Sequence, residues 1–182
     1  NIVNKLGDIK FPRALIPAKA TTRVRLDLNL DSRVEPGKKF DINDPHNTSH
    51  YSTGVEVYDS QGNKHLLTLF FVKVADRQWD VHALADGKEV TGGTPGKWAE
   101  VWAGKLGFTV DGRLDTEVVT KEAINFTGGA LQNQKIVFDF GDSITTDKGD
   151  GLNGTKQYGK ESDLISWSQD GAAAGTIVNL SF

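Results

Sequence analysis

The sequence contains neither cysteine nor methionine in its 182 residues, and only five prolines. Without cysteine the chain forms no disulfide and no cysteine-ligated zinc site, so the sequence points to neither an oxidising nor a reducing compartment. A helix that crosses a bilayer needs about 20 consecutive apolar residues, and no stretch of the chain approaches that length. We therefore expect a soluble protein with no membrane partner.

An excess of charge of one sign is also missing, because 21 Lys and Arg stand against 24 Asp and Glu, for a formal net charge of −3. The basic residues are scattered and form no basic stripe of the kind that binds phosphate backbones. We expect no nucleic-acid partner. A compact chain of this length buries about 70% of its unfolded surface, which is enough for one large domain or two small ones.

The lack of methionine extends to the first position, where the bulky Asn1 stands. The common removal of an initiator methionine would not expose such a residue. The closing letters GTIVNLSF have the β-branched character of a strand in mid-course. We therefore expect the chain to be an excerpt of a longer protein.

The 20 glycines fall in short, turn-like clusters between runs rich in Val, Leu, Ile, Thr and Phe. This punctuation is typical of an antiparallel β protein, and helical periodicity is nearly absent. We predict an all-β fold of antiparallel sheets. The strands are expected at Thr22–Asn29, Thr53–Tyr58, His65–Val74, Gln78–Leu84, Trp98–Phe108, Glu117–Asn125, Ile136–Phe140 and Thr176–Phe182.

The hairpin VEVYDSQGNKHLLTLFFVKV, residues 55–74, is unusually apolar. In its second strand one face carries Phe70 and Val72 and the other carries Leu69 and Phe71. A strand that is apolar on both faces is expected to be central and covered on both sides, whereas its half-polar neighbours read as flanking strands.

Two polar stretches bracket this central block, namely residues 31–50 and 141–163. Polar segments of this length read as surface loops, mobile or ligand-holding. We place domain junctions near Asp31 and Trp167. Two β domains follow: residues 1–30 and 167–182 form parts of a smaller inner β domain, and residues 31–166 form an inserted outer domain, a β-barrel or sandwich.

Several motifs imitate chemical sites without the context that the chemistry needs. The spacing of GDGLNG, residues 149–154, matches a dinucleotide-binding loop, but no strand precedes it and no helix follows. The triplet DFG at residues 139–141 lacks the other kinase elements. Asp142, Asp147 and Asp150 suggest at most a shallow cation site, because an EF-hand would need side chains where glycines stand. We predict no cofactor and no metal.

The histidines and serines offer no catalytic arrangement. His46 and His50 lie four apart in a segment interrupted by proline, with no third metal ligand nearby. His65 and His82 fall within predicted strands and read as cross-strand pairing residues. No G-x-S-x-G elbow occurs. We predict no catalytic residues. A hydrolase would need two carboxylates about 5–10 Å apart in space, and a sequence alone does not show that distance, so this alternative stays open.

Two tryptophans suggest a binding alternative. Trp98 and Trp102 in GKWAEVWAG share a strand face by parity, as aromatic residues that stack on sugars do. Core packing is the more common role of tryptophan in strands. An extracellular carbohydrate-binding or adhesin-like β module therefore stays open as the alternative.

Residues 51–87, YSTGVEVYDSQGNKHLLTLFFVKVADRQWDVHALADG, resemble the central region of bacterial flagellar hook proteins. The positions that carry the resemblance are Tyr58, Asp59, Ser60, Gly62, Asn63, Phe71, Val72, Lys73, Trp79 and Val81. Residues 16–32 and 165–182 are similar to the segments by which that family's chain enters and leaves its outer domain. The match covers about half the chain, whereas loops 88–97 and 142–160 match no known pattern.

The resemblance implies a structural subunit of the hook, the flexible joint that transmits motor torque to the filament. It implies self-assembly, with the rod, the hook cap and the hook-filament junction proteins as further partners. It also implies an extracellular location in the flagellum after export from the cytoplasm. The helical terminal segments that drive polymerisation in this family are missing here, so we expect the isolated chain to be monomeric.

Overall fold

The computed structural model describes residues 13–178. Within this range the chain forms strands joined by turns and long loops, with one short α-helix and one 3-10 turn. The strands are β1 (Arg13–Ile16), β2 (Arg23–Asn29), β3 (Tyr51–Tyr58), β4 (Lys64–Ala75), β5 (Gln78–Asp86), β6 (Trp98–Phe108), β7 (Leu114–Lys121), β8 (Val137–Asp139), β9 (Asp163–Gln169) and β10 (Gly175–Val178); the helices are η1 (Gly87–Glu89) and α1 (Ile144–Asp147). The predicted all-β fold is confirmed. No helix of the described part is long and apolar enough to cross a bilayer.

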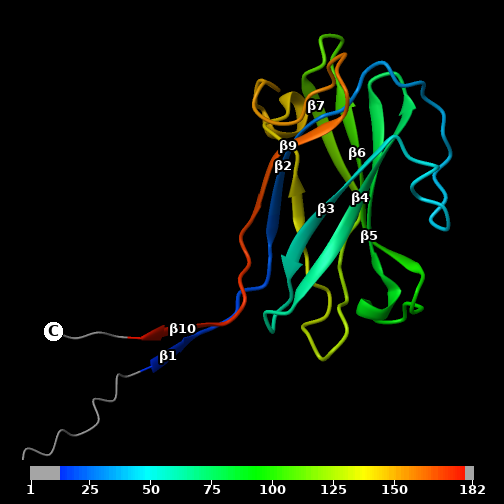
Figure 1. The fold of residues 1–182 in the computed structure, drawn as a ribbon. Coiled ribbons are helices and arrows are strands. Elements are labelled where there is room, and N and C mark those ends of the chain that lie inside the picture. Colours follow the sequence, from blue (N-terminus) through cyan, green and yellow to red (C-terminus); the bar gives the residue numbers. More distant parts are fainter. Residues whose placement is uncertain (1–12, 179–182) are drawn as a thin grey trace, which may run out of the picture.

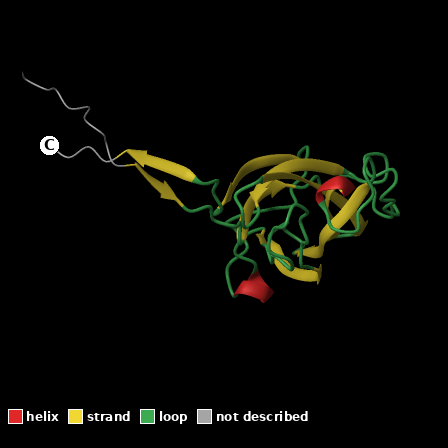
Figure 2. Cartoon of the chain, turned by 90° about the horizontal axis from the view of Figure 1, so that it is seen from below, coloured by secondary structure: helices red, strands yellow, loops and turns green. Residues whose placement is uncertain are grey.

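The strands form three sheets. β3-β4-β5-β6-β7 is an antiparallel meander, whereas β2 lies between β8, to which it is parallel, and the antiparallel β9. β1 and β10 pair only with each other. The two larger sheets close into one barrel-like body, and the β1-β10 ribbon extends away from it (Figures 1 and 2).

The turn between β3 and β4 shows why the central hairpin forms. Asp59 Oδ1 accepts hydrogen bonds from the backbone N–H groups of Gln61 and Asn63, at 2.9 and 3.0 Å. Gly62 takes a φ of +81°, which favours glycine. Asp59 is buried and bonds His65 as well. The DSQGN letters therefore fix the register of β3 against β4.

The main core lies between the meander and the smaller sheet. Its members are apolar side chains that alternate along the strands, as expected for residues on inward faces. The core includes Val24, Leu26, Leu28, Val55, Val57, Leu67, Leu69, Phe71, Trp79, Val81, Trp102, Leu106, Phe126, Phe138 and Phe140. Phe71 packs edge-on against Phe140, with 6.1 Å between ring centroids.

The prediction that β4 is covered on both faces holds for only part of the strand. Phe70 and Val72, opposite the main core, are buried. On the same side Leu66 is 57% exposed and Val74 is 36% exposed. The reason is that residues 31–50 cover only the middle of β4, where Phe40 and His46 contact the ring of Phe70. The rest of that face is open.

The strand boundaries differ from the prediction in several places. β1 and β9 were not predicted, and β7 begins and ends earlier than the expected 117–125. β8 is shorter than the expected 136–140. The last predicted strand begins at Gly175, and residues 179–182 lie outside the described part of the chain.

The packing of β2 bears on the domain boundaries. Leu26 and Leu28 lie in the same core as the meander, and β9 pairs along β2. Only the β1-β10 ribbon stands apart (Figure 1). The division into residues 1–30 with 167–182 and residues 31–166 stays a prediction, but these contacts place β2 and β9 with the main body.

Candidate functional site

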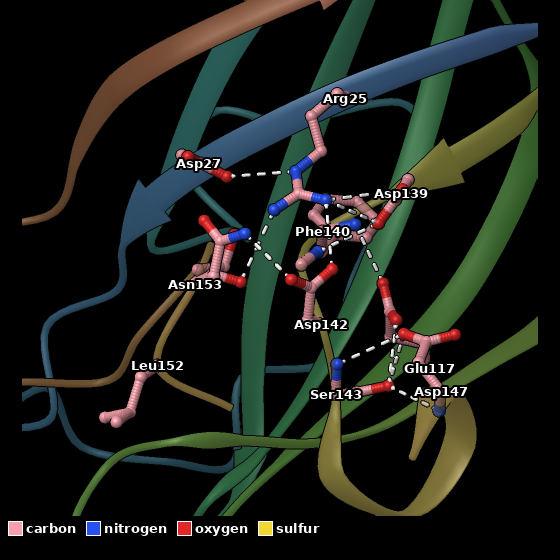
Figure 3. Close-up of polar contacts among 12 residues, drawn as sticks. Arg25, Asp27, Glu117, Asp139, Phe140, Asp142, Ser143, Asp147, Leu152 and Asn153 are labelled. Atoms are coloured by element: carbon pink, nitrogen blue, oxygen red, sulfur yellow. Dashed lines mark hydrogen bonds and ion pairs between the residues drawn. The ribbon is translucent and has the colours of Figure 1, made fainter. Parts of the chain in front are cut away.

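A polar cluster occupies one edge of the body, where β2, β7, β8 and the segment 141–154 meet (Figure 3). At its centre the Arg25 guanidinium lies 3.2 Å from Asp27, 3.4 Å from Asp139 and 3.5 Å from Asp142. It also donates to the carbonyl of Asn153 at 3.4 Å. Burial lowers the pKa of Arg25, but these carboxylates more than compensate and raise it. Arg25 therefore ties segment 141–154 to β2 as a cation.

The second half of the cluster is a pair of carboxyl groups. Glu117 on β7 and Asp147 on α1 both reach the hydroxyl of Ser143, at 3.1 and 2.7 Å. Burial and the hydrogen bond with Asp147 raise the pKa of Glu117 to about 8. The same hydrogen bond, together with those from Ser143, lowers the pKa of Asp147. Glu117 is therefore the weaker acid of the two and Asp147 the stronger.

The three aspartates proposed as a shallow cation site do not converge. Asp142 accepts from the Asn153 amide at 2.8 Å and faces Arg25. Asp147 turns to Ser143, and Asp150 caps the backbone N–H of Leu152 at 2.9 Å. Among residues 13–178 no group of three His, Asp or Glu side chains is arranged to hold a metal ion.

The loop that was predicted to be mobile or ligand-holding is tied into the body. Thr155 is buried, donates to the carbonyl of Leu26 at 3.1 Å and accepts from the N–H of Leu28 at 3.2 Å. Gln157 accepts from the indole N–H of Trp79 at 2.6 Å. The polar side chains of this loop make hydrogen bonds to the neighbouring strands. A packed loop needs such bonds because its buried polar groups have no water to bind.

Both histidines in strands pair with carboxylates. His82 pairs across strands with Glu100 of β6, as predicted, whereas the partner of His65 is Asp59 in the turn between β3 and β4. His65 Nε2 lies 2.9 Å from Asp59, and hydrogen bonds from His65 and the neighbouring backbone outweigh burial and lower the pKa of that carboxyl. His82 Nδ1 lies 2.7 Å from Glu100 and its hydrogen bond lowers the pKa of Glu100. The His82 ring stacks on Phe40, with 3.9 Å between centroids. These histidines hold packed structure together.

The shared face expected for Trp98 and Trp102 is wrong. The register of β5 against β6 shifts between Ala83 and Leu84, which marks a bulge in β6. An extra residue reverses the faces of the side chains that follow. Trp102 is 3% exposed and packs on Phe138, whereas Trp98 is 37% exposed on the other side of the sheet. The two rings form no sugar-binding platform.

A groove of about 320 Å³, lined by both polar and apolar side chains, borders the polar cluster. Its walls include the exposed side chains of Leu152, Tyr158 and Ile165, with Lys156 and Lys160 beside them. The sequence did not single out these residues, and it did not single out Glu117 or Ser143. Glu117 and Ser143 lie far apart along the chain, and the groove residues belong to a polar loop without strand periodicity. The bridges from Lys156 to Asn29 of β2 and to Arg113 help to bring that loop against the body.

The chain matches a family model described as the flagellar basal body protein FlaE D2 domain over residues 29–172. It is 30% identical over 181 residues to the flagellar hook protein FlgE of Escherichia coli, which covers 94% of this chain and 42% of that protein. It is 29% identical over 180 residues to the FlgE of Salmonella typhimurium, with the same coverages. The chain therefore spans less than half the length of these relatives.

Two solved structures are also similar. A 32 kDa fragment of the flagellar hook protein FlgE from Caulobacter crescentus is 18% identical, with a TM-score of 0.48 over 72% of this chain and 52% of that one. The Helicobacter pylori flagellar hook protein FlgE2 is 19% identical, with a TM-score of 0.40 over 69% of this chain and 26% of that one.

Proposed function

Because this chain belongs to the family of the flagellar basal body protein FlaE D2 domain, we propose that it is part of a structural subunit of the bacterial flagellar hook. The observation that carries the proposal is the family match over residues 29–172, which includes most of the barrel-like body. The named relatives are hook proteins. In this role the chain is a structural component and not an enzyme, and it needs no cofactor.

The core suits a part that transmits torque. A hook bends while it turns, so its subunits must be stiff inside and compliant where they meet. Phe70 and Phe71 are buried on opposite faces of β4, and close-packed interiors resist compression. Exposed ion pairs such as Lys64–Glu56 are worth only about 0–1 kcal/mol each, so surface contacts of this kind can exchange cheaply.

The body connects to the ribbon through two neighbouring chain segments, residues 17–22 and 170–174. Lys19 and Ala172 exchange two backbone hydrogen bonds, at 2.9 and 2.8 Å. Two tethers that are bonded to each other restrict twisting more than bending. We propose that the ribbon belongs to an inner β domain, that the body is the inserted outer domain, and that the body tilts as a rigid unit about these two segments.

The partners follow from the same role. Copies of the whole protein assemble with one another in the hook, and the rod, the hook cap and the hook-filament junction proteins bind at its ends. The protein is exported from the cytoplasm and functions outside the cell. No observation favours the carbohydrate-binding or adhesin alternative, because the tryptophan pair on which it depended is split between two faces.

Immunogold labelling tests the proposed location. Antibodies raised against residues 31–166 should label the hook of isolated flagella from the source bacterium. The same serum should give no label after its specific antibodies have been removed by adsorption to the purified protein. Label along the filament or over the cell surface, with the hook bare, would contradict the proposal.

Sedimentation tests the state of the isolated chain. We expect residues 1–182 to be monomeric at micromolar concentration, because the chain carries a net charge of −3 and matches only 42% of the length of its hook-protein relatives. Analytical ultracentrifugation across a tenfold range of concentration should give one species of about 20 kDa, in keeping with the 19.8 kDa of the chain. A ring or filament of defined size would show that the body carries a sufficient assembly contact by itself.

A further inference from the structure

The carboxyl pair joins two parts of the chain that lie about 30 residues apart, β7 and the short helix α1. Ser143 is fully buried between them. Its hydroxyl oxygen lies 2.7 Å from Asp147 Oδ2 and 3.1 Å from Glu117 Oε2, and it accepts from the backbone N–H of Asp147 at 3.2 Å. Glu117 Oε1 accepts from the backbone N–H of Phe140 at 2.7 Å.

Counting protons shows what this arrangement requires. A serine hydroxyl carries one hydrogen, yet two carboxyl oxygens lie within hydrogen-bond distance of it. If the serine proton serves Asp147, the contact with Glu117 needs a second proton, and two ionised carboxylates this close would repel each other. We propose that Glu117 and Asp147 share one proton, and that this proton fastens segment 141–154 to β7 as a pH-dependent latch.

The latch holds a defined piece of surface. The backbone N–H of Glu117 donates to the hydroxyl oxygen of Thr146 at 3.0 Å, so α1 is bonded to β7 through backbone and side chain together. Beyond α1, Gly149 N–H donates to the carbonyl of Ser143 at 2.9 Å. Leu152, near the end of the segment, lines the neighbouring groove. Release of the latch would therefore loosen α1 and the turn that follows it, while Arg25 continues to hold Asn153 beside the groove.

The elements around the pair carry further charged groups. They are Asp115 on β7, Asp139 on β8, Arg23 and Arg25 on β2, and Asp142, Lys148 and Asp150 on segment 141–154, whereas Lys105 of β6 points to the other face of the sheet, toward Asp80. The positive charge of Arg23 favours the ionised form of Asp147. Asp147 is thus the member of the pair that stays ionised, and Glu117 is the member that holds the proton.

The direction of the pH effect follows. The pKa of Glu117 in the folded protein, about 8, lies above the 4.5 of a free glutamate. The stabilisation is therefore complete below the lower value, declines as the pH rises and is lost as the pH passes about 8. The lowered pKa of Asp147 acts in the opposite sense, so its own contribution is lost only at acid pH.

Limited proteolysis of the whole chain tests the latch. Trypsin cleavage after Lys148, which is exposed on the segment, is measured by mass spectrometry between pH 7 and 9 and normalised to a free peptide of residues 141–154. The normalised rate for the wild type should rise about tenfold across this range, as the second carboxyl ionises. Glu117→Gln keeps an acceptor for Phe140 and a donor for Ser143 or Asp147, so its rate should stay at the low value at every pH.

The matched control is Asp115→Asn, which changes another carboxylate on β7, bonded to Thr145 at 2.6 Å. This variant should keep the wild-type rise. Between pH 7 and 9 an infrared band of a protonated carboxyl group should fade in the wild type as the pH passes about 8, and it should be missing from Glu117→Gln throughout this range. A flat wild-type rate, or an equal rise in Glu117→Gln, would overturn the latch. Neither result would bear on the proposed place in the hook.

Discussion

Replacing Phe71 with alanine is expected to lower the free energy of unfolding by about 3–5 kcal/mol. The Phe71 ring is fully buried in the main core, and it contacts Phe140 from the β8 end and Tyr51 from β3. Both neighbours are held by strands, so they cannot close the space that the ring leaves. A cavity adds its own cost to the lost burial, and this places the variant high in the range.

Phe70→Ala should cost nearly as much, about 3 kcal/mol, for a different reason. Phe70 is also fully buried, but its cover is Phe40 and His46 from the long loop and Trp98 from the beginning of β6. A loop relaxes more readily than a strand, so part of the cavity should collapse. Urea unfolding followed by tryptophan fluorescence measures both variants.

Leu66→Ala is the matched control for this pair. It lies on the same strand and the same face as Phe70, but it is 57% exposed, so the change should fall within about 0.5 kcal/mol of zero. If Phe70→Ala behaved like Leu66→Ala, the second face of β4 would be wet in solution. Cover on both faces of β4 would then not explain the stiffness that we attribute to the body.

The sequence predicted β4 and β5 well because apolar residues recur in them with strand periodicity. The predicted bounds of β6 coincide with the observed ones, but β7, which is mostly exposed, was placed a few residues too late. β9 was missed for the converse reason. Its side chains are mostly exposed or half-buried, and backbone pairing with β2, which leaves no trace in composition, holds it in place.

The errors at the candidate sites arise from structural features that the local sequence pattern does not show, namely a bulge and a contact between distant segments. Parity along a strand assigns faces only while the strand is regular, and the bulge in β6 separates Trp98 from Trp102. The pairing of Glu117 with Asp147 depends on where segment 141–154 lands, and it lands there because Thr155 and its neighbours pair with β2. Contacts between residues so distant along the chain are not encoded in any local pattern.

Lys73 explains how a polar loop comes to cover an apolar strand. Its side chain is only 4% exposed, and its ammonium group donates to the carbonyls of Ser32 at 2.9 Å and Val34 at 3.1 Å. The backbone of Lys73 adds two further bonds to the same loop, from Gly37 N–H to its carbonyl and from its own N–H to His50 Nδ1. One residue of β4 thus fastens both the beginning and the end of residues 31–50.

Lys73→Met should therefore lower the free energy of unfolding by about 2–4 kcal/mol, because methionine fills similar space but leaves the carbonyls of the half-buried Ser32 and Val34 without their charged donor. The backbone bonds survive the change, so the loss isolates the ammonium group. Lys105→Met is the matched control, since Lys105 pairs with Asp80 at 2.9 Å on the open surface, where such pairs are worth about 0–1 kcal/mol.

The loop also brings Phe40 onto Phe70, so Lys73→Met combined with Phe40→Ala should cost less than the sum of the two single changes. Equal effects of Lys73→Met and Lys105→Met in urea unfolding would mean that packing alone holds the loop. Strict additivity with Phe40→Ala would mean that the ammonium group and the aromatic cover act independently.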